Sequence, residues 1–241
     1  WLYKNCRYIL YAKGGTVMAS TIYSHTGDSY VRKQVSTSWS DAQGSATTDG
    51  DASISNAGYY DYGVYARVAG SRGSANYDCH RSYFQFDLSG ESGTVDSATI
   101  SIRMDSLGSS GDAAKAIMVM AAALDDGVED HGNVFSSGTT WYNDISDIVT
   151  ISTTVGYHDF TMNSDGITLI QNASAGAAGG VVTVGLVSWK YDYVGTTPYA
   201  NGDYSQFQVA YSEFLGTTLD PKMTITYVVP TDNAIFFGAN F

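Results

Sequence analysis

Short segments in which every second residue is apolar recur along this chain, and this alternation constrains the fold more than any other feature. A β-strand points successive side chains to opposite faces of its sheet, so a period of two marks a strand with one buried face. The clearest apolar positions are Tyr60, Tyr62, Val64, Ala66 and Val68; Phe84, Phe86 and Leu88; and Ala98, Ile100, Ile102 and Met104. The turn sequence Ser-Gly-Glu-Ser-Gly at 89–93 separates the last two segments, which predicts a hairpin.

Further strands and one helix complete the predicted fold. The nearly all-apolar run 116–124 predicts a strand buried on both faces, with a brief helix as the alternative. Later strands are expected at 148–151, 181–189, 207–211 and 223–229. Asn163 and Ser164 can cap a helix of about two turns that ends at the Gly-rich stretch 176–180. These elements predict an all-β fold, an antiparallel jelly-roll-type β-sandwich with one short helix.

The composition favours one folded domain and disfavours two classes of partner. A sandwich of 241 residues is an ordinary single domain, and a chain with 44% hydrophobic and 15% charged residues can bury a core. The net charge of -12, from 24 acidic and 12 basic residues, opposes nucleic-acid binding and disfavours anionic membranes. No run approaches the roughly 18 apolar residues that span a bilayer. Neither nucleic acid nor membrane is therefore an expected partner.

Residues 1–17 differ in composition from the rest of the chain, and they are either a translated leader or a genuine N-terminal arm. They hold three of the twelve basic residues and Cys6, one of the two cysteines. Lys13, Gly14 and Gly15 can be encoded by AAAGGAGGT, a bacterial ribosome-binding sequence, at a suitable start distance from Met18. The leader interpretation is favoured, and the intact mass of the natural protein tests it. The expected organisation is 1–17 as leader or arm, 18–229 as one β-sandwich domain and 230–241 as an apolar C-terminal tail.

Residues 81–89 read Arg-Ser-Tyr-Phe-Gln-Phe-Asp-Leu-Ser, and residues 93–100 read Gly-Thr-Val-Asp-Ser-Ala-Thr-Ile. Together with shorter matches at 28–31, 139–141, 159–161, 211–213 and 221–227, this pattern resembles the DNRLRE-type family of extracellular β-sandwich modules over about residues 28–228. The resemblance implies a jelly roll of the kind found in surface proteins and beside polysaccharide-active enzymes, with some members binding glycans. The chain departs from the family in being nearly all module and in an insert rich in Ser, Asp and Gly at about 40–58.

Sequence motifs for catalysis are absent, so the chain is not expected to be an enzyme. The four histidines, His25, His80, His131 and His158, lack the spacing of a metal-ligating helix. No nucleophile elbow, phosphate loop or dinucleotide fingerprint occurs. Acidic residues are numerous enough for a glycosidase pair, but no pattern nominates one. Asp49 and Asp51 could supply oxygen ligands to calcium, yet solvated loop charges are the favoured interpretation, and no cofactor is predicted.

Two features are candidates for binding. Clustered tyrosines offer flat amphipathic rings to a glycan or a protein partner, with core and strand-edge packing as the alternative; the candidates are Tyr59, Tyr60, Tyr191, Tyr193 and Tyr199. The tail after Pro230 is too apolar for a solvated terminus; its apolar residues include Ile235, Phe236, Phe237 and Phe241. It either packs on its own domain or acts as an assembly tail that contacts a partner.

These observations lead to a hypothesis of non-catalytic surface display. Modules of the family that this chain resembles normally belong to secreted proteins, yet neither Trp1 nor Met18 begins a recognisable signal peptide. A bacteriophage virion protein reconciles both facts, because it is made in the host cytoplasm and then faces outward. The expected role is a head or tail surface component that contacts other virion proteins, or itself in a homo-oligomer, and surface polysaccharide. The alternative is a secreted, extracellular carbohydrate-binding module, and an enzyme ranks third.

Overall fold

The chain is an all-β protein in the computed structural model, as the alternation predicts. The structure describes residues 8–12, 15–24, 28–35, 38–44, 61–69, 76–106, 108, 111–122, 135–137, 140–141, 143–198, 204–212 and 218–229. Every strand pair within these ranges is antiparallel. No helix within them has the length and apolar character needed to cross a membrane.

Strands follow one another along the chain, with short helical segments between them. The strands are β1 Tyr8–Ala12, β2 Gly15–Tyr23, β3 Ser29–Val35, β4 Asp61–Ala69, β5 Asn76–Asp87, β6 Thr94–Ser106, β7 Lys115–Met120, β8 Phe135–Ser137, β9 Thr140–Trp141, β10 Val149–Thr150, β11 Gly156–Thr161, β12 Val181–Ser188, β13 Ser205–Val209 and β14 Lys222–Val229. The helical segments are α1 Trp39–Gln43, α2 Ser164–Ser174, the 3-10 turns η1 Gly111–Ala114 and η3 Ala177–Gly180, and the π-helical turn η4 Trp189–Tyr193.

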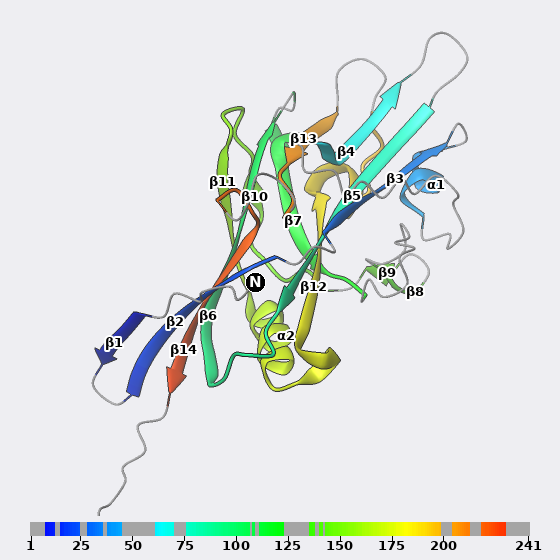
Figure 1. Cartoon of the computed structure of the whole chain (residues 1–241). Helices are drawn as coiled ribbons and strands as arrows, with labels where there is room; N and C mark the ends of the chain where they lie inside the picture. The colour runs from blue at the N-terminus through cyan, green and yellow to red at the C-terminus, as the bar shows by residue number, and fades with distance from the viewer. Residues whose placement is uncertain are drawn as a thin grey trace, which may run out of the picture.

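Twelve strands form one continuous sheet, in the order β1-β2-β14-β6-β13-β4-β5-β12-β7-β10, with β11 on β6 and β3 on β5. The two longest strands exchange partners along their length. Residues 76–80 of β5 pair with β4 and residues 82–87 with β12, while β6 pairs first with β14 and then with β13. The sheet thereby folds over on itself, with β2, β14 and β11 on one side and β3, β5 and β12 on the other (Figure 1). This confirms the antiparallel sandwich, while the jelly-roll strand order stays a prediction.

The core lies between the two sides of the folded sheet and uses the faces that the alternation predicts. The predicted inward residues at the end of β5 and in β6 are all buried, at 3% exposure or less: Phe84, Phe86, Leu88, Ala98, Ile100, Ile102 and Met104. Met223, Ile225 and Tyr227 of β14 are buried to the same degree. Val64, Ala66 and Val68 of β4 are buried as well. In β7 both faces are buried, as predicted for the apolar run.

Some predicted elements end earlier than the sequence indicated. Strand β7 stops at Met120, and β10 covers only two residues, with the exposed Ile148 and the buried Ile151 both outside it. Strand β12 ends at Ser188, because the backbone turns at Trp189, whose carbonyl accepts a hydrogen bond from the Val194 N–H five residues later. That pattern is a single π-helical turn, which hydrophobic periodicity does not signal.

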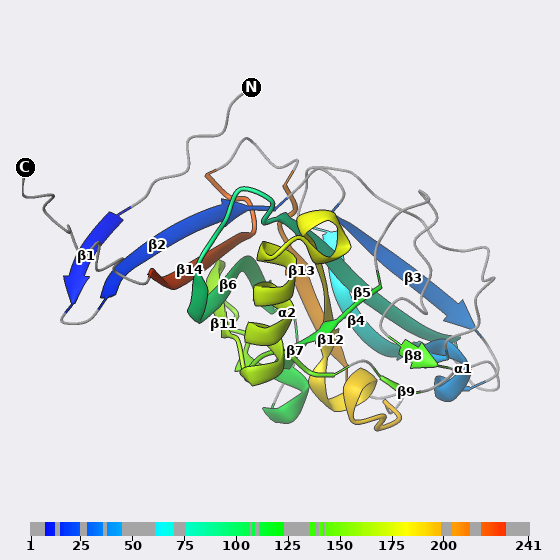
Figure 2. The ribbon, with the colours of Figure 1, turned by 90° about the horizontal axis from the view of Figure 1, so that it is seen from below.

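Helix α2 begins where the caps predicted it. The Asn163 side chain accepts hydrogen bonds from the backbone N–H groups of Asp165 and Gly166, which satisfies two of the unpaired donors of the first turn. The helix is eleven residues long, longer than the predicted two turns, and it buries Ile170 and Ala173 against the core. It lies in front of the sheet in the view of Figure 2, next to β6 and η3.

The compositional boundary at Met18 falls inside a strand. Strand β2 pairs with β14 from Thr16 opposite Val229 to Tyr23 opposite Lys222, and Met18 lies opposite Tyr227. Strand β1 pairs with the first half of β2. Both figures show β1 and the adjoining ends of β2 and β14 projecting from the sandwich, and we call these three segments the projecting ribbon. The translated-leader interpretation stays a prediction, with the intact mass as its test.

Candidate functional site

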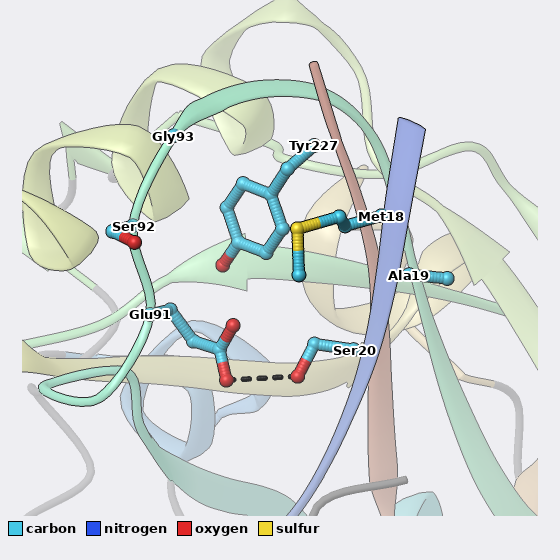
Figure 3. Close-up of a pocket in the computed structure, with 7 residues that line it drawn as sticks. All are labelled: Met18, Ala19, Ser20, Glu91, Ser92, Gly93 and Tyr227. Atoms are coloured by element: carbon cyan, nitrogen blue, oxygen red, sulfur yellow. Dashed lines mark hydrogen bonds between the residues drawn. The ribbon is translucent and has the colours of Figure 1, made fainter. Parts of the chain in front are cut away.

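A pocket of about 200 Å³ opens at the base of the projecting ribbon (Figure 3). We call it the Glu91 pocket; its lining residues are Met18, Ala19, Ser20, Glu91, Ser92, Gly93 and Tyr227. They come from β2, from β14 and from the turn between β5 and β6. The volume lies below the roughly 300–1,000 Å³ of typical small-molecule sites, so it suits a single side chain or another small group.

The register of β2 and β14 places three of the lining residues. Met18 lies opposite Tyr227, and Ser20 lies opposite Ile225. Because side chains two apart share a face, Met18 and Ser20 point to the same side as Ile22, which is buried in the core. The pocket is therefore the end of the core-facing side of these two strands, at the place where the turn between β5 and β6 covers them.

This turn is held in place by backbone hydrogen bonds. The Glu91 N–H donates to the Leu88 carbonyl at 2.9 Å, and the Leu88 N–H donates to the Gly180 carbonyl at 2.7 Å. A Cβ on Gly180, which has a φ of +88°, would come within 2.9 Å of the Ser89 backbone. The turn can pack this closely on η3 only because residue 180 is a glycine.

Helix α2 fixes the other end of the turn through one side chain. The Gln171 amide accepts a hydrogen bond from the Val95 N–H at 2.7 Å and donates one to the Gly93 carbonyl at 3.1 Å. Gly93 has a φ of +122°, which residues with side chains rarely adopt. The turn is therefore fixed on both sides, and with it the position of Glu91.

Glu91 is a buried acid in a turn whose other residues are mostly exposed. Its exposed fraction is 7%, and its Oε1 accepts a hydrogen bond from the Ser20 hydroxyl at 2.8 Å. Figure 3 shows the Glu91 side chain reaching across to Ser20, with the Tyr227 ring and the Met18 thioether beside them. Within the part of the chain that the structure describes, no basic side chain forms an ion pair with Glu91.

Buried charges in proteins are normally paired with an opposite charge or bound to a metal. One carboxylate with a serine hydroxyl falls short of the six to eight oxygens that calcium takes. Among the described residues no three His, Cys, Asp or Glu side chains gather into a metal-binding group. The pocket can therefore accept a hydrogen-bond donor, above all a cationic one, at the carboxylate.

A second candidate surface surrounds the π-helical turn η4. The rings of Trp189 and Tyr193 stack with their centroids 5.3 Å apart and their planes within 19°. Both are half-buried and rest on the apolar cluster that contains Tyr83 and Val187. The Tyr193 hydroxyl donates to Asp144 Oδ1 at 2.9 Å, and burial together with this carboxylate raises the pKa of Tyr193 to about 12. Paired flat rings of this kind can take the face of a sugar.

The predicted binding tyrosines are only partly brought together. Tyr193 lies on the aromatic surface, whereas the Tyr191 side chain is completely buried and packs in the core cluster with Trp39 and Cys79. The remaining candidates lie outside the described residues: Tyr59, Tyr60, Tyr199, the tail residues Ile235, Phe236, Phe237 and Phe241, and the calcium candidates Asp49 and Asp51.

No family model matches the sequence, and no curated protein is significantly similar to it.

Sequence reasoning located the turn that carries Glu91 but not its role. An acid between serines and glycines is typical of a solvated turn. Neither the neighbouring residues nor the spacing shows that Ser20, about seventy positions earlier, donates a hydrogen bond to it. The only signal is the turn sequence between two core strands. The hairpin predicted from it is wrong, because β5 and β6 do not pair with each other: β5 pairs with β3, β4 and β12, and β6 pairs with β11, β13 and β14.

Proposed function

We propose that this chain is a non-catalytic structural protein that attaches to a larger assembly, and that this assembly is a bacteriophage virion whose surface it helps to form. The observation that carries the attachment role is the Glu91 pocket, a preformed socket in which a buried carboxylate has no cationic partner among the described residues. Its size suits a protruding group of another protein better than a substrate.

The position of the pocket favours the same role. It lies at the base of the projecting ribbon, where β1 is the last strand of the sheet order and pairs with β2 alone among the described strands. An edge strand offers backbone donors and acceptors to a neighbouring chain. The segment Tyr8–Ala12 contains no charge, proline or glycine that would oppose such pairing. The edge of β1 and the Glu91 pocket next to it together form a contact surface with two parts.

The virion location rests on the sequence. The resemblance to extracellular β-sandwich modules favours an exposed surface, and the net charge of -12 favours solubility of copies before they assemble. The tail 230–241 is proposed as a further contact.

Quantitative mass spectrometry of particles purified from the natural source tests this function. We expect the chain in stoichiometric amounts, with hundreds of copies for a capsid-coating role and a handful for a tail component. Absence of the chain from the particles would overturn the virion proposal.

A second candidate function is glycan binding, favoured specifically by the Trp189 and Tyr193 stack. It predicts saturable binding of the purified chain to a polysaccharide that is lost in Trp189→Ala. The stacked rings would then be the contact, since the apolar face of a sugar packs on a flat aromatic surface.

A further inference from the structure

The Glu91 pocket has the properties of a receptor for a positively charged side chain. Glu91 is more than nine-tenths buried, and the turn that presents its carboxylate is held by hydrogen bonds with η3 and α2. A rigid, preformed site loses little conformational entropy when it binds.

The carboxylate retains capacity for further hydrogen bonds. Of its two oxygens, Oε1 accepts from Ser20, and no further partner of the carboxylate occurs among the described residues. Burying an acid without an opposite charge is costly, and a charge-assisted hydrogen bond from a cation would offset that cost. A neutral ligand would leave the charge uncompensated.

The walls of the pocket suit the rest of a long basic side chain. The Tyr227 ring and the Met18 thioether flank the carboxylate (Figure 3). Lysine and arginine bury their methylene groups along apolar surface while the charged end finds a polar partner, and a cation is also attracted to the face of an aromatic ring. The excess of 24 acidic over 12 basic residues in the chain further favours a basic partner.

We propose that the Glu91 pocket binds a lysine or arginine side chain that protrudes from a partner protein. This inference rests on the proposed attachment function and names the chemistry of the partner.

Small side-chain analogues test the proposal on the full chain. Nα-acetyl-arginine amide and Nα-acetyl-lysine amide are titrated into protein labelled with ¹³C at the methionine methyl groups, with the Met18 signal assigned by Met18→Leu. Nα-acetyl-citrulline amide, which keeps the shape of arginine without its charge, serves as the neutral control. We expect the Met18 methyl signal to shift with the two cationic amides and not with the citrulline amide.

Two variants locate the binding. Glu91→Gln removes the charge and keeps the size of the side chain, so affinity should fall by at least about tenfold, the weakening expected when a charged hydrogen bond is lost. Asp96→Asn makes the same change in charge at an exposed position nearby in β6, and affinity should stay within about twofold, because exposed charges contribute little.

The outcomes separate this proposal from the proposed function. No shift of the Met18 signal with either cation, an equal loss in both variants, or a shift with the citrulline amide or a neutral monosaccharide would overturn the basic side-chain receptor. Such a result with the chain present in particles leaves the attachment role standing. Selective cation binding by a chain that is absent from particles overturns the virion location alone.

Discussion

Two buried acids in this molecule differ in whether a basic side chain pairs with them. Asp192, which is 1% exposed, receives two hydrogen bonds of 2.7 Å from the Arg81 guanidinium, itself completely buried. Glu91, which is 7% exposed, receives one from the Ser20 hydroxyl. The first acid is neutralised within the fold, and the second has no such cation among the described residues.

The surroundings of Asp192 are those of a structural junction. The Arg81 guanidinium also donates to the Gln43 carbonyl, and the side chains of Trp39 and Gln43 donate to the Tyr191 carbonyl. These contacts connect α1, β5 and the π-helical turn η4. Burial acts to lower the pKa of Arg81, but Asp192 more than offsets it, so the pKa lies above its ordinary value. Both charges of this pair are therefore balanced within the fold.

A third buried acid shows an intermediate solution. Asp28, 1% exposed, accepts hydrogen bonds from the backbone N–H groups of Gln85 at 3.1 Å and Ser212 at 3.3 Å. Burial raises the pKa of Asp28 to about 8, even though these bonds and one from Ser24 lower it. The comparison teaches that burial alone does not mark a binding site: what distinguishes Glu91 is a pocket beside an acid whose charge the described residues do not balance.

The largest expected effect is at the pair of Arg81 and Asp192. Asp192→Asn leaves the Arg81 guanidinium buried without its anion, which should cost about 3–5 kcal/mol of unfolding free energy. Urea denaturation followed by fluorescence measures the loss. The matched control is Asp112→Asn, which removes an ion pair of 2.6 Å between Lys115 and a largely exposed acid, and which should not measurably change the midpoint. A loss in Asp192→Asn no greater than in this control would contradict the structural role of the buried pair.

An intermediate effect is expected at Asp28, and it depends on pH. Because its pKa is raised from 3.8 to about 8, the folded protein holds this proton more tightly than the unfolded chain does. The stabilising contribution is therefore fully present below about pH 4 and is lost as pH rises toward about 8, by at most about 1.4 kcal/mol per pH unit.

Unfolding free energies of the wild type and of Asp28→Asn, measured from pH 4 to pH 9, test this pH dependence. The wild type should lose stability relative to the variant as pH rises, and the difference should level off above about pH 8. A difference that does not change with pH would mean that the two backbone donors keep Asp28 ionised in the folded state throughout.

The core strands were the part of this fold that could be predicted. The alternation at Phe84, Phe86, Ile100 and Ile102 depends on neighbours two residues away, so the sequence alone shows which side is buried. The Asn163 cap is equally local. Such local patterns could not predict that β5 and β6 change partner strands along their length. That exchange depends on contacts with strands far away in the sequence.

The candidate site was less predictable for the same reason. The pairing of Arg81 with Asp192 spans 111 residues, and the contact of Ser20 with Glu91 spans 71. Tyr191 and Tyr193 are two apart and share their residue type, yet the π-helical turn buries the first and places the second beside Trp189. Only the folded chain distinguishes an acid held by a cation from an acid that faces a pocket.

The smallest expected effect, at Glu91, is also the one that decides the comparison. Glu91→Gln keeps an oxygen to accept the Ser20 hydrogen bond and removes a buried charge that the described residues leave unbalanced. Stability should therefore stay unchanged or rise by up to about 1 kcal/mol, in contrast to the large loss expected for Asp192→Asn. Both variants are measured by urea denaturation under the same conditions. A loss above about 2 kcal/mol in Glu91→Gln would mean that the carboxylate supports the fold as Asp192 does, and the reason to expect a partner at this pocket would disappear.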